Sequence, residues 1–149
     1  MALDASPDRA TGLGAVSPDE RGDAVARTWL YVAGVALLAA GLVGFADNPV
    51  VSRRPDALLQ VDTLHGVVLL VTALIALFIG ASQRGRVLAQ ATIAFGGVYL
   101  VLYAATLVSP DLWGLFATPV NTADHWLHLV VAAGSIVAGL ASTWQEGAG

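Results

Sequence analysis

The sequence predicts an all-α integral membrane four-helix bundle, and two observations carry that prediction. Of the 149 residues, 56% are hydrophobic and 12% are charged, whereas an ordinary soluble domain carries about a quarter charged residues. The apolar residues also fall into four runs, each long enough to cross the roughly 30 Å hydrocarbon layer as a helix. Because lipid offers no hydrogen-bond partners, the backbone of each run must close its hydrogen bonds within its own helix.

The four predicted spans cover residues 28–45, 61–80, 87–108 and 125–141. No Arg, Lys or Glu occurs within them, and Asp62 is their only acidic residue. The spans also contain many glycines, which membrane helices accept more often than soluble ones do. We therefore predict one membrane domain over residues 27–144, followed by a short C-terminal tail at 145–149.

Residues 1–26 differ in composition from the rest of the chain. Five acidic residues stand here against two arginines, with Gly, Ser and Pro between them. Such a segment cannot bury enough apolar surface to fold, so we predict a largely disordered cytoplasmic tail. Ser17, Pro18 and Glu20 form a capping-box sequence with proline at the first helical position, which predicts that the first helix begins in water before it enters the membrane.

The arginines predict the orientation, because basic residues near span ends are retained in the cytoplasm. Four arginines lie on the side of the termini and two on the other side: Arg21, Arg27, Arg84 and Arg86 against Arg53 and Arg54. Tryptophans favour the headgroup level, which predicts Trp29 and Trp144 at the inner surface and Trp113 and Trp126 at the outer one. The sequence thus predicts a multi-pass protein of the cytoplasmic membrane with both termini inside.

Polar residues of three spans gather at one depth near the outer surface. Asp62 and His65 share a helical face at the start of the second span, and Asp124 and His128 share one at the start of the fourth. The third span brings its tyrosines to the same level, where a phenol needs a hydrogen-bond partner. The sequence predicts an intramembrane polar cluster of Asp62, His65, Tyr99, Tyr103, Asn121, Asp124 and His128.

Small residues continue the inward faces of the spans, because they let helix backbones approach closely in lipid. The predicted small-residue positions are Thr72, Ala76 and Gly80 on the second span, Ala132, Ser135 and Gly139 on the fourth, and Ala36, Ala40 and Gly44 on the first. A repeated Phe-Ala and Pro-Val pattern precedes the second and fourth spans, at 45–50 and 116–120. This repeat favours two parallel helical-hairpin units.

The residue types present exclude several classes of function. Without cysteine the chain can hold no disulfide, thiolate nucleophile or iron–sulfur cluster. A net charge of -4 removes the electrostatic basis for nucleic-acid binding. No nucleophile elbow and no phosphate loop is present, so we expect neither an enzyme nor a bound cofactor. Arginine supplies all seven basic residues, which fits a salt-adapted or GC-rich source.

Three functions remain open for the polar cluster. The first is a structural or accessory membrane protein, whose partners are the lipid bilayer and either further copies of the chain or an unknown membrane protein. The second is a small transporter or channel-like protein for ions, protons or a small solute, because intramembrane carboxylates and imidazoles often mark pathways. The third is a redox protein that binds a metal or haem through His65, His125 or His128, although their spacing is not specific for a metal.

The start of the fourth span carries a motif of a known family. Residues 120–129 read Val-Asn-Thr-Ala-Asp-His-Trp-Leu-His-Leu. This run resembles the signature of an uncharacterised family of small prokaryotic four-span membrane proteins, known only as a domain of unknown function. In that family an Asn-Thr-Ala-Asp-Asn-Trp-Leu-His run opens the last helix, and an Asn-x-x-His element opens the second.

The chain departs from the family pattern at three positions. The second element begins with Asp62 where the family usually has Asn, His125 replaces a usual Asn, and Leu69 stands where a second histidine is common. These departures do not favour a conserved metal chemistry. The resemblance covers residues 28–141 and implies a four-helix membrane protein without an established activity.

Overall fold

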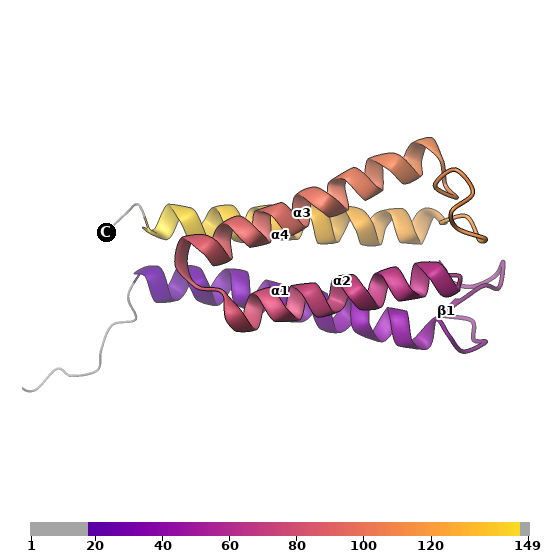
Figure 1. Ribbon diagram of the computed structural model, residues 1–149, viewed down its shortest axis with the longest axis horizontal. Helices are drawn as coiled ribbons and strands as arrows, with labels where there is room; N and C mark the ends of the chain where they lie inside the picture. Colours follow the sequence, from indigo (N-terminus) through magenta and orange to yellow (C-terminus); the bar gives the residue numbers. More distant parts are fainter. Residues whose placement is uncertain (1–17, 147–149) are drawn as a thin grey trace, which may run out of the picture.

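The computed structural model describes residues 18–146, which form four long helices (Figure 1). The helices are arranged as two hairpins, each made of two antiparallel helices. The helices are α1 (Pro18–Val43), α2 (Thr63–Ser82), α3 (Gly85–Val108) and α4 (Thr122–Glu146). Strands β1 (Val51–Ser52) and β2 (Leu59–Gln60) form a short parallel pair in the loop between α1 and α2. The predicted all-α four-helix bundle is confirmed.

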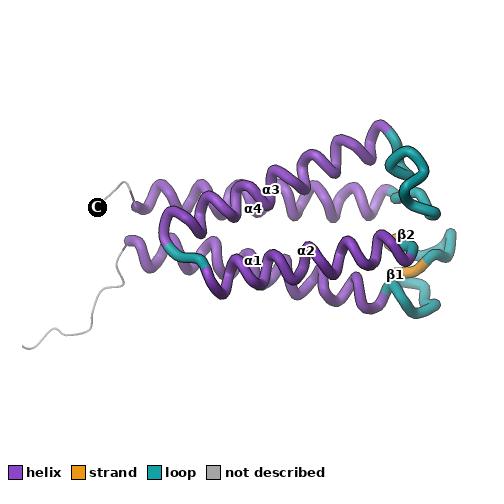
Figure 2. The backbone as a smooth tube through the Cα atoms, viewed as in Figure 1, coloured by secondary structure: helices purple, strands orange, loops and turns teal. Residues whose placement is uncertain are grey.

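The connections divide the bundle into two unlike ends, as Figure 2 shows. The long α1–α2 and α3–α4 loops lie at one end, which we call the loop end. The start of α1, the end of α4 and the short α2–α3 turn lie at the opposite end, which we call the terminal end. Helix α3 diverges from α2 toward the loop end, so the two hairpins meet mainly along α1 and α4.

Each helix contains a stretch long and apolar enough to cross a membrane, and the chain is a multi-pass membrane protein. These stretches are Glu20–Val43, Thr63–Ser82, Gly85–Val108 and Thr122–Thr143. They agree with the predicted spans to within a few residues, except at the start of α1. Large apolar side chains such as Phe78, Val101 and Val137 are exposed on the outside of the bundle, where lipid would cover them.

Helix α1 begins at Pro18, where the capping-box sequence predicts a helix start, and so takes up the last part of the segment 1–26 that we predicted as largely disordered. Residues 18–26 are helical, because the end of α4 packs against them: Ala26 is fully buried, and the Ser142 hydroxyl donates to the Gly22 carbonyl oxygen at 2.7 Å. The tail prediction for residues 1–17 and 147–149, the predicted capping role of Ser17 and the predicted placement of the Trp144 side chain lie outside the described residues.

Small residues set the closest helix contacts, but the predicted stripe on α1 is only partly right: Ala40 packs against the core and Gly44 lies close to Val61. Ala36 is exposed, and the glycines that approach α2 are Gly34 and Gly41. A Cβ at either position would meet a leucine side chain of α2 at 2.8 Å. Seven residues separate the two glycines, which places them on one side of α1 after two turns.

Polar contacts hold the helices together at the terminal end. The Asp23 carboxylate accepts a hydrogen bond from the backbone N–H of Gly85 at 2.8 Å, and Arg27 donates to the Gln83 carbonyl oxygen at 3.2 Å. The indole N–H of Trp29 donates to the Ser135 hydroxyl at 2.9 Å. Trp29 therefore packs between α1 and α4, whereas we predicted it as a marker of the inner surface.

Candidate functional site

The candidate site lies at the loop end, where the N-termini of α2 and α4 lie under the two long loops. A helix N-terminus leaves its first backbone N–H groups without partners inside the helix. Asp62 is the N-cap of α2, and its Oδ1 accepts the backbone N–H of His65 at 2.8 Å. Asn121 and Asp124 form a reciprocal capping box on α4, in which each side chain accepts the other residue's backbone N–H at 3.1 Å.

Both carboxylates also reach the loop of the opposite hairpin. The second oxygen of Asp62 accepts the backbone N–H of Thr118, in the α3–α4 loop, at 3.0 Å. Oδ2 of Asp124 accepts the backbone N–H of Gln60, in β2, at 3.1 Å. Asn121 adds a third link, because its amide donates to the Leu58 carbonyl oxygen at 2.9 Å. The helix caps of one hairpin therefore bind the loop backbone of the other.

Asp62 lies just before the span of α2 and is 2% exposed, so solvent does little to stabilise its charge. Its hydrogen bonds therefore decide whether it is ionised. Burial acts to raise the pKa of Asp62, but the backbone N–H groups of His65, Thr118 and Ala117 favour the ionised form. The pKa of Asp62 is lowered as a result. Asp62 is therefore a carboxylate at neutral pH, and its two oxygens serve as acceptors.

Behind the carboxylates, aromatic rings and imidazoles pack together. The His65 ring stacks on Phe116 with centroids 4.8 Å apart, and the His128 ring lies 6.0 Å from His65 and 5.8 Å from Tyr99. His65, Tyr99 and His128 are 1%, 1% and 4% exposed. These rings border a cavity of about 10 Å³ that lies between α2, α3, α4 and the α3–α4 loop.

Three of the buried polar atoms in this region have no hydrogen-bond partner within residues 18–146. They are Nδ1 of His65, Nδ1 of His128 and Oδ1 of Asp124. A buried polar atom without a partner costs about 1–3 kcal/mol, so such atoms call for an explanation. The other oxygen of Asp124 already accepts two backbone hydrogen bonds.

The structure brings together most of the predicted cluster, but with bonding that differs from our prediction. We expected the acids to pair with the histidine and tyrosine side chains. Instead the carboxylates bind backbone N–H groups, because two helix N-termini present these donors at the same place. The hydroxyl of Tyr99 lies 2.8 Å from that of Thr72, which follows Asp62 by ten residues and so by nearly three helical turns.

Tyr103 lies apart from the central rings. It makes an edge-on contact with His125, with the ring centroids 6.1 Å apart. Together with Trp126 these residues line a separate lateral pocket of about 200 Å³ between α3 and α4. His125 also carries a buried Nε2 without a partner in the described part of the chain.

Sequence reasoning missed three members of the site. Thr118 and Gln60 take part through backbone N–H groups, which any residue except proline supplies, so no side chain identified them. Phe116 covers the His65 ring. Its only signal was the repeated Phe-Ala pattern, which indicated a duplication and not a contact.

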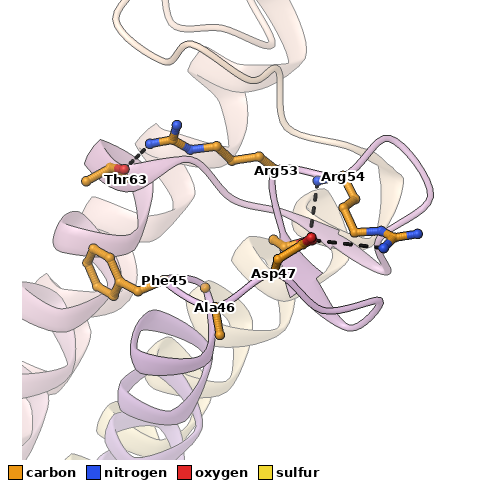
Figure 3. A pocket seen from close by; sticks show the side chains of 8 residues that line it. Phe45, Ala46, Asp47, Arg53, Arg54 and Thr63 are labelled. Atoms are coloured by element: carbon orange, nitrogen blue, oxygen red, sulfur yellow. Dashed lines mark hydrogen bonds and ion pairs between the residues drawn. The ribbon is translucent and has the colours of Figure 1, made fainter.

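A further pocket of about 300 Å³ lies beside the start of α2 and is shown in Figure 3. Arg53 reaches across it to the Thr63 hydroxyl, and Arg54 faces Asp47 at 4.0 Å. Arg54 also holds Asp56 by two hydrogen bonds, at 2.9 and 3.0 Å. These bonds raise the pKa of Arg54 and lower that of Asp56. The arginines therefore fasten the α1–α2 loop.

Metal ligands were considered at His65, His125 and His128. Among residues 18–146, no three histidine, aspartate or glutamate residues stand close enough together to hold a metal ion.

Comparison with known proteins gives one result. A family model described as Domain of unknown function (DUF4383) matches residues 27–141. No curated protein and no solved structure matches the chain.

Proposed function

This chain belongs to the DUF4383 family, and we propose that it is a structural or accessory membrane protein without enzymatic activity. Four apolar helices place it in the membrane, and the polar cluster then needs a role there. In this proposal the cluster fixes how the two hairpins pack. Its residues are structural links and not reactive groups.

The bonding of Asp62 and Asp124 carries the proposal. Asp62 caps α2 and Asp124 lies in the first turn of α4. Each accepts a backbone N–H from the loop of the other hairpin, at 3.0 Å for Asp62 and 3.1 Å for Asp124. Charge-assisted hydrogen bonds of this kind are about twice as strong as neutral ones. Carboxylates held by fixed backbone donors suit a structural link, whereas a transport site needs groups that exchange partners.

We further propose that both termini lie in the cytoplasm and that the loop end faces outward, from the arginine count given above. The proposed partners are the lipids of the cytoplasmic membrane and either a second copy of the chain or another membrane protein. The broad apolar outer face, including Phe78 and Val137, is available for either protein partner.

Reconstituted vesicles test the structural role directly. We expect vesicles that contain the wild-type chain to show the same fluxes of protons, common ions and small solutes as protein-free vesicles. Asp62→Asn and His128→Gln should lower the unfolding temperature in detergent and leave those fluxes unchanged. A protein-dependent flux that disappears on substitution of a cluster residue would show that the cluster does more than hold the bundle.

A transporter or channel-like protein is the second candidate, and the unpartnered polar atoms favour it. Oδ1 of Asp124 and Nδ1 of His65 and His128 are buried groups that could exchange protons or bind a passing solute. The deciding comparison is Asp124→Asn against Asp111→Asn, because Asp111 is a carboxylate of the α3–α4 loop that bonds the Ser109 hydroxyl. A flux lost only in Asp124→Asn would establish this function.

Binding of a metal or haem by His65, His125 or His128 is the remaining alternative. It predicts visible absorption or a stoichiometric metal content in the purified protein. A colourless protein without bound metal would end it.

A further inference from the structure

The small cavity between the histidines has the size and lining of a binding site for a single small molecule. Its volume is about 10 Å³, close to the roughly 10–15 Å³ that one water molecule requires. The cavity is bordered by His65 from α2, Thr106 from α3 and His128 from α4. Leu112 and Phe116 of the α3–α4 loop border it too, so it lies beneath that loop.

Two of the residues that border the cavity carry a polar atom without a partner. Nδ1 of His65 and Nδ1 of His128 have none within the described residues, and both side chains are more than nine-tenths buried. The Thr106 hydroxyl donates to the Tyr103 carbonyl oxygen at 3.0 Å, which leaves its oxygen able to accept another hydrogen bond. Buried water in proteins typically makes about three hydrogen bonds.

The ring geometry fits one atom between the two imidazoles. Their centroids are 6.0 Å apart and their planes are tilted by 48°, so the two rings do not stack face to face. A ring nitrogen of neutral histidine is a donor in one tautomer and an acceptor in the other. Water has two protons to donate and two lone pairs that accept, so it can bond both nitrogens and also donate to the Thr106 hydroxyl when at least one Nδ1 carries a proton.

We propose that this cavity binds one water molecule, which bridges Nδ1 of His65 and Nδ1 of His128 and donates to the hydroxyl of Thr106. The water joins α2 of the first hairpin to α3 and α4 of the second. It adds a water-mediated link between the hairpins to the two carboxylate bridges. Its role as a link rests on the proposed structural function. The flux measurements test that role, whereas the experiments below test the water site alone.

Magnetic resonance of the full chain in bilayers tests the site, because the sequence contains only three histidines. With ¹⁵N-labelled histidine, we expect magnetisation from water protons to reach Nδ1 of both His65 and His128. In His128→Phe the transfer to His65 should fall at least severalfold, while the signals of His125 stay unchanged. No transfer to either Nδ1, or an undiminished transfer to His65 in that variant, would overturn the proposal.

A double-mutant cycle provides the second measurement and does not depend on the resonances. His65→Phe and His128→Phe should each reduce the folded-to-unfolded ratio, because each leaves the water and the other imidazole with fewer partners. If the two single effects were independent, their fold-changes would multiply. The folded-to-unfolded ratio of the double variant should instead be about tenfold higher than that product. His65→Phe combined with His125→Phe is the control, since His125 does not border the cavity, and its effects should add. Additive effects in both cycles, or a stoichiometric metal ion in the wild-type protein, would contradict a bridging water.

Discussion

Asp62 combines two tasks that sequence patterns usually assign to separate residues. One oxygen caps α2 through the N–H of His65, and the other holds the N–H of Thr118 across the hairpin interface. Both donors are backbone groups, so the site depends on the acceptor alone. An asparagine at this position would keep one acceptor but replace the second by a donor.

Asp62→Asn should therefore lower the free energy of unfolding by about 1–3 kcal/mol, the cost of leaving a buried N–H without an acceptor. The N–H concerned is that of Thr118, because the cap on His65 can persist. Thermal unfolding in detergent followed by circular dichroism measures the change. Asp56→Asn is the control, since Asp56 is an exposed partner of Arg54 and solvent screens that pair, so its unfolding temperature should stay close to that of the wild type. Equal effects of the two substitutions would contradict the role of Asp62.

The stability of the bundle should also depend on pH through Asp62. Its pKa is lower in the folded chain than the ordinary value of 3.8, so its contribution is fully present above that value and is lost as the pH falls through the folded pKa. We expect the wild-type unfolding temperature to fall with acidification below about pH 4, and Asp62→Asn to show a smaller fall. Denaturation series between pH 7 and pH 2 on both proteins provide the comparison, and parallel curves would exclude this contribution.

Helices α3 and α4 approach so closely that glycine is required on the facing side of α3. A Cβ on Gly96 would meet the Ala132 carbonyl oxygen at 2.8 Å and the Ser135 Cβ at 2.9 Å. The neighbouring Gly97 has nothing within 4 Å of the same position. Adjacent glycines on one helix thus differ only in the side to which they point.

This difference makes a matched pair of substitutions. Gly96→Ala should destabilise the bundle by about 1–3 kcal/mol, because backbone on both helices must shift. Gly97→Ala should be neutral or stabilising by up to about 1 kcal/mol, because alanine favours the helix over glycine. Unfolding temperatures of the two variants decide the matter. Similar destabilisation by both would mean that helix propensity and not packing governs this interface.

The molecule as a whole is two hairpins joined at both ends by different means. The loop end relies on carboxylates that bind backbone N–H groups, and the terminal end on Asp23 and Arg27, which bind the α2–α3 turn. The four spans within residues 18–146 place the start of α1 and the end of α4 on one side of the membrane. The absence of cysteine from the chain makes that arrangement accessible to single-cysteine labelling.

The proposed orientation predicts a simple labelling pattern. A membrane-impermeant maleimide should label Leu58→Cys, at the loop end, in intact cells, because Leu58 is 63% exposed. Ser82→Cys, at the terminal end, should react only after the membrane is opened. The cysteine-free parent chain is the control. A reversed pattern would overturn the orientation, and labelling of both variants in intact cells would contradict the spans.

The predicted and observed sites differ in a way that has a physical cause. The spacing of Asp62 with His65 and of Asp124 with His128 predicted that each pair shares a helical face, because helical periodicity fixes which residues do so. It could not give their partners. Those partners are backbone groups at Gln60 and Thr118, placed there by the path of two loops.

Membrane insertion was determined by the sequence itself, because it depends on the length and polarity of each run and on the lack of hydrogen-bond partners in lipid. The number of helices and the approximate limits of each followed from the same local rule. The inward face of α1, the separation of Tyr103 from Tyr99 and the small cavity between His65 and His128 were decided only by tertiary structure. They depend on how two hairpins rotate and lean against each other, and packing between distant segments sets that geometry.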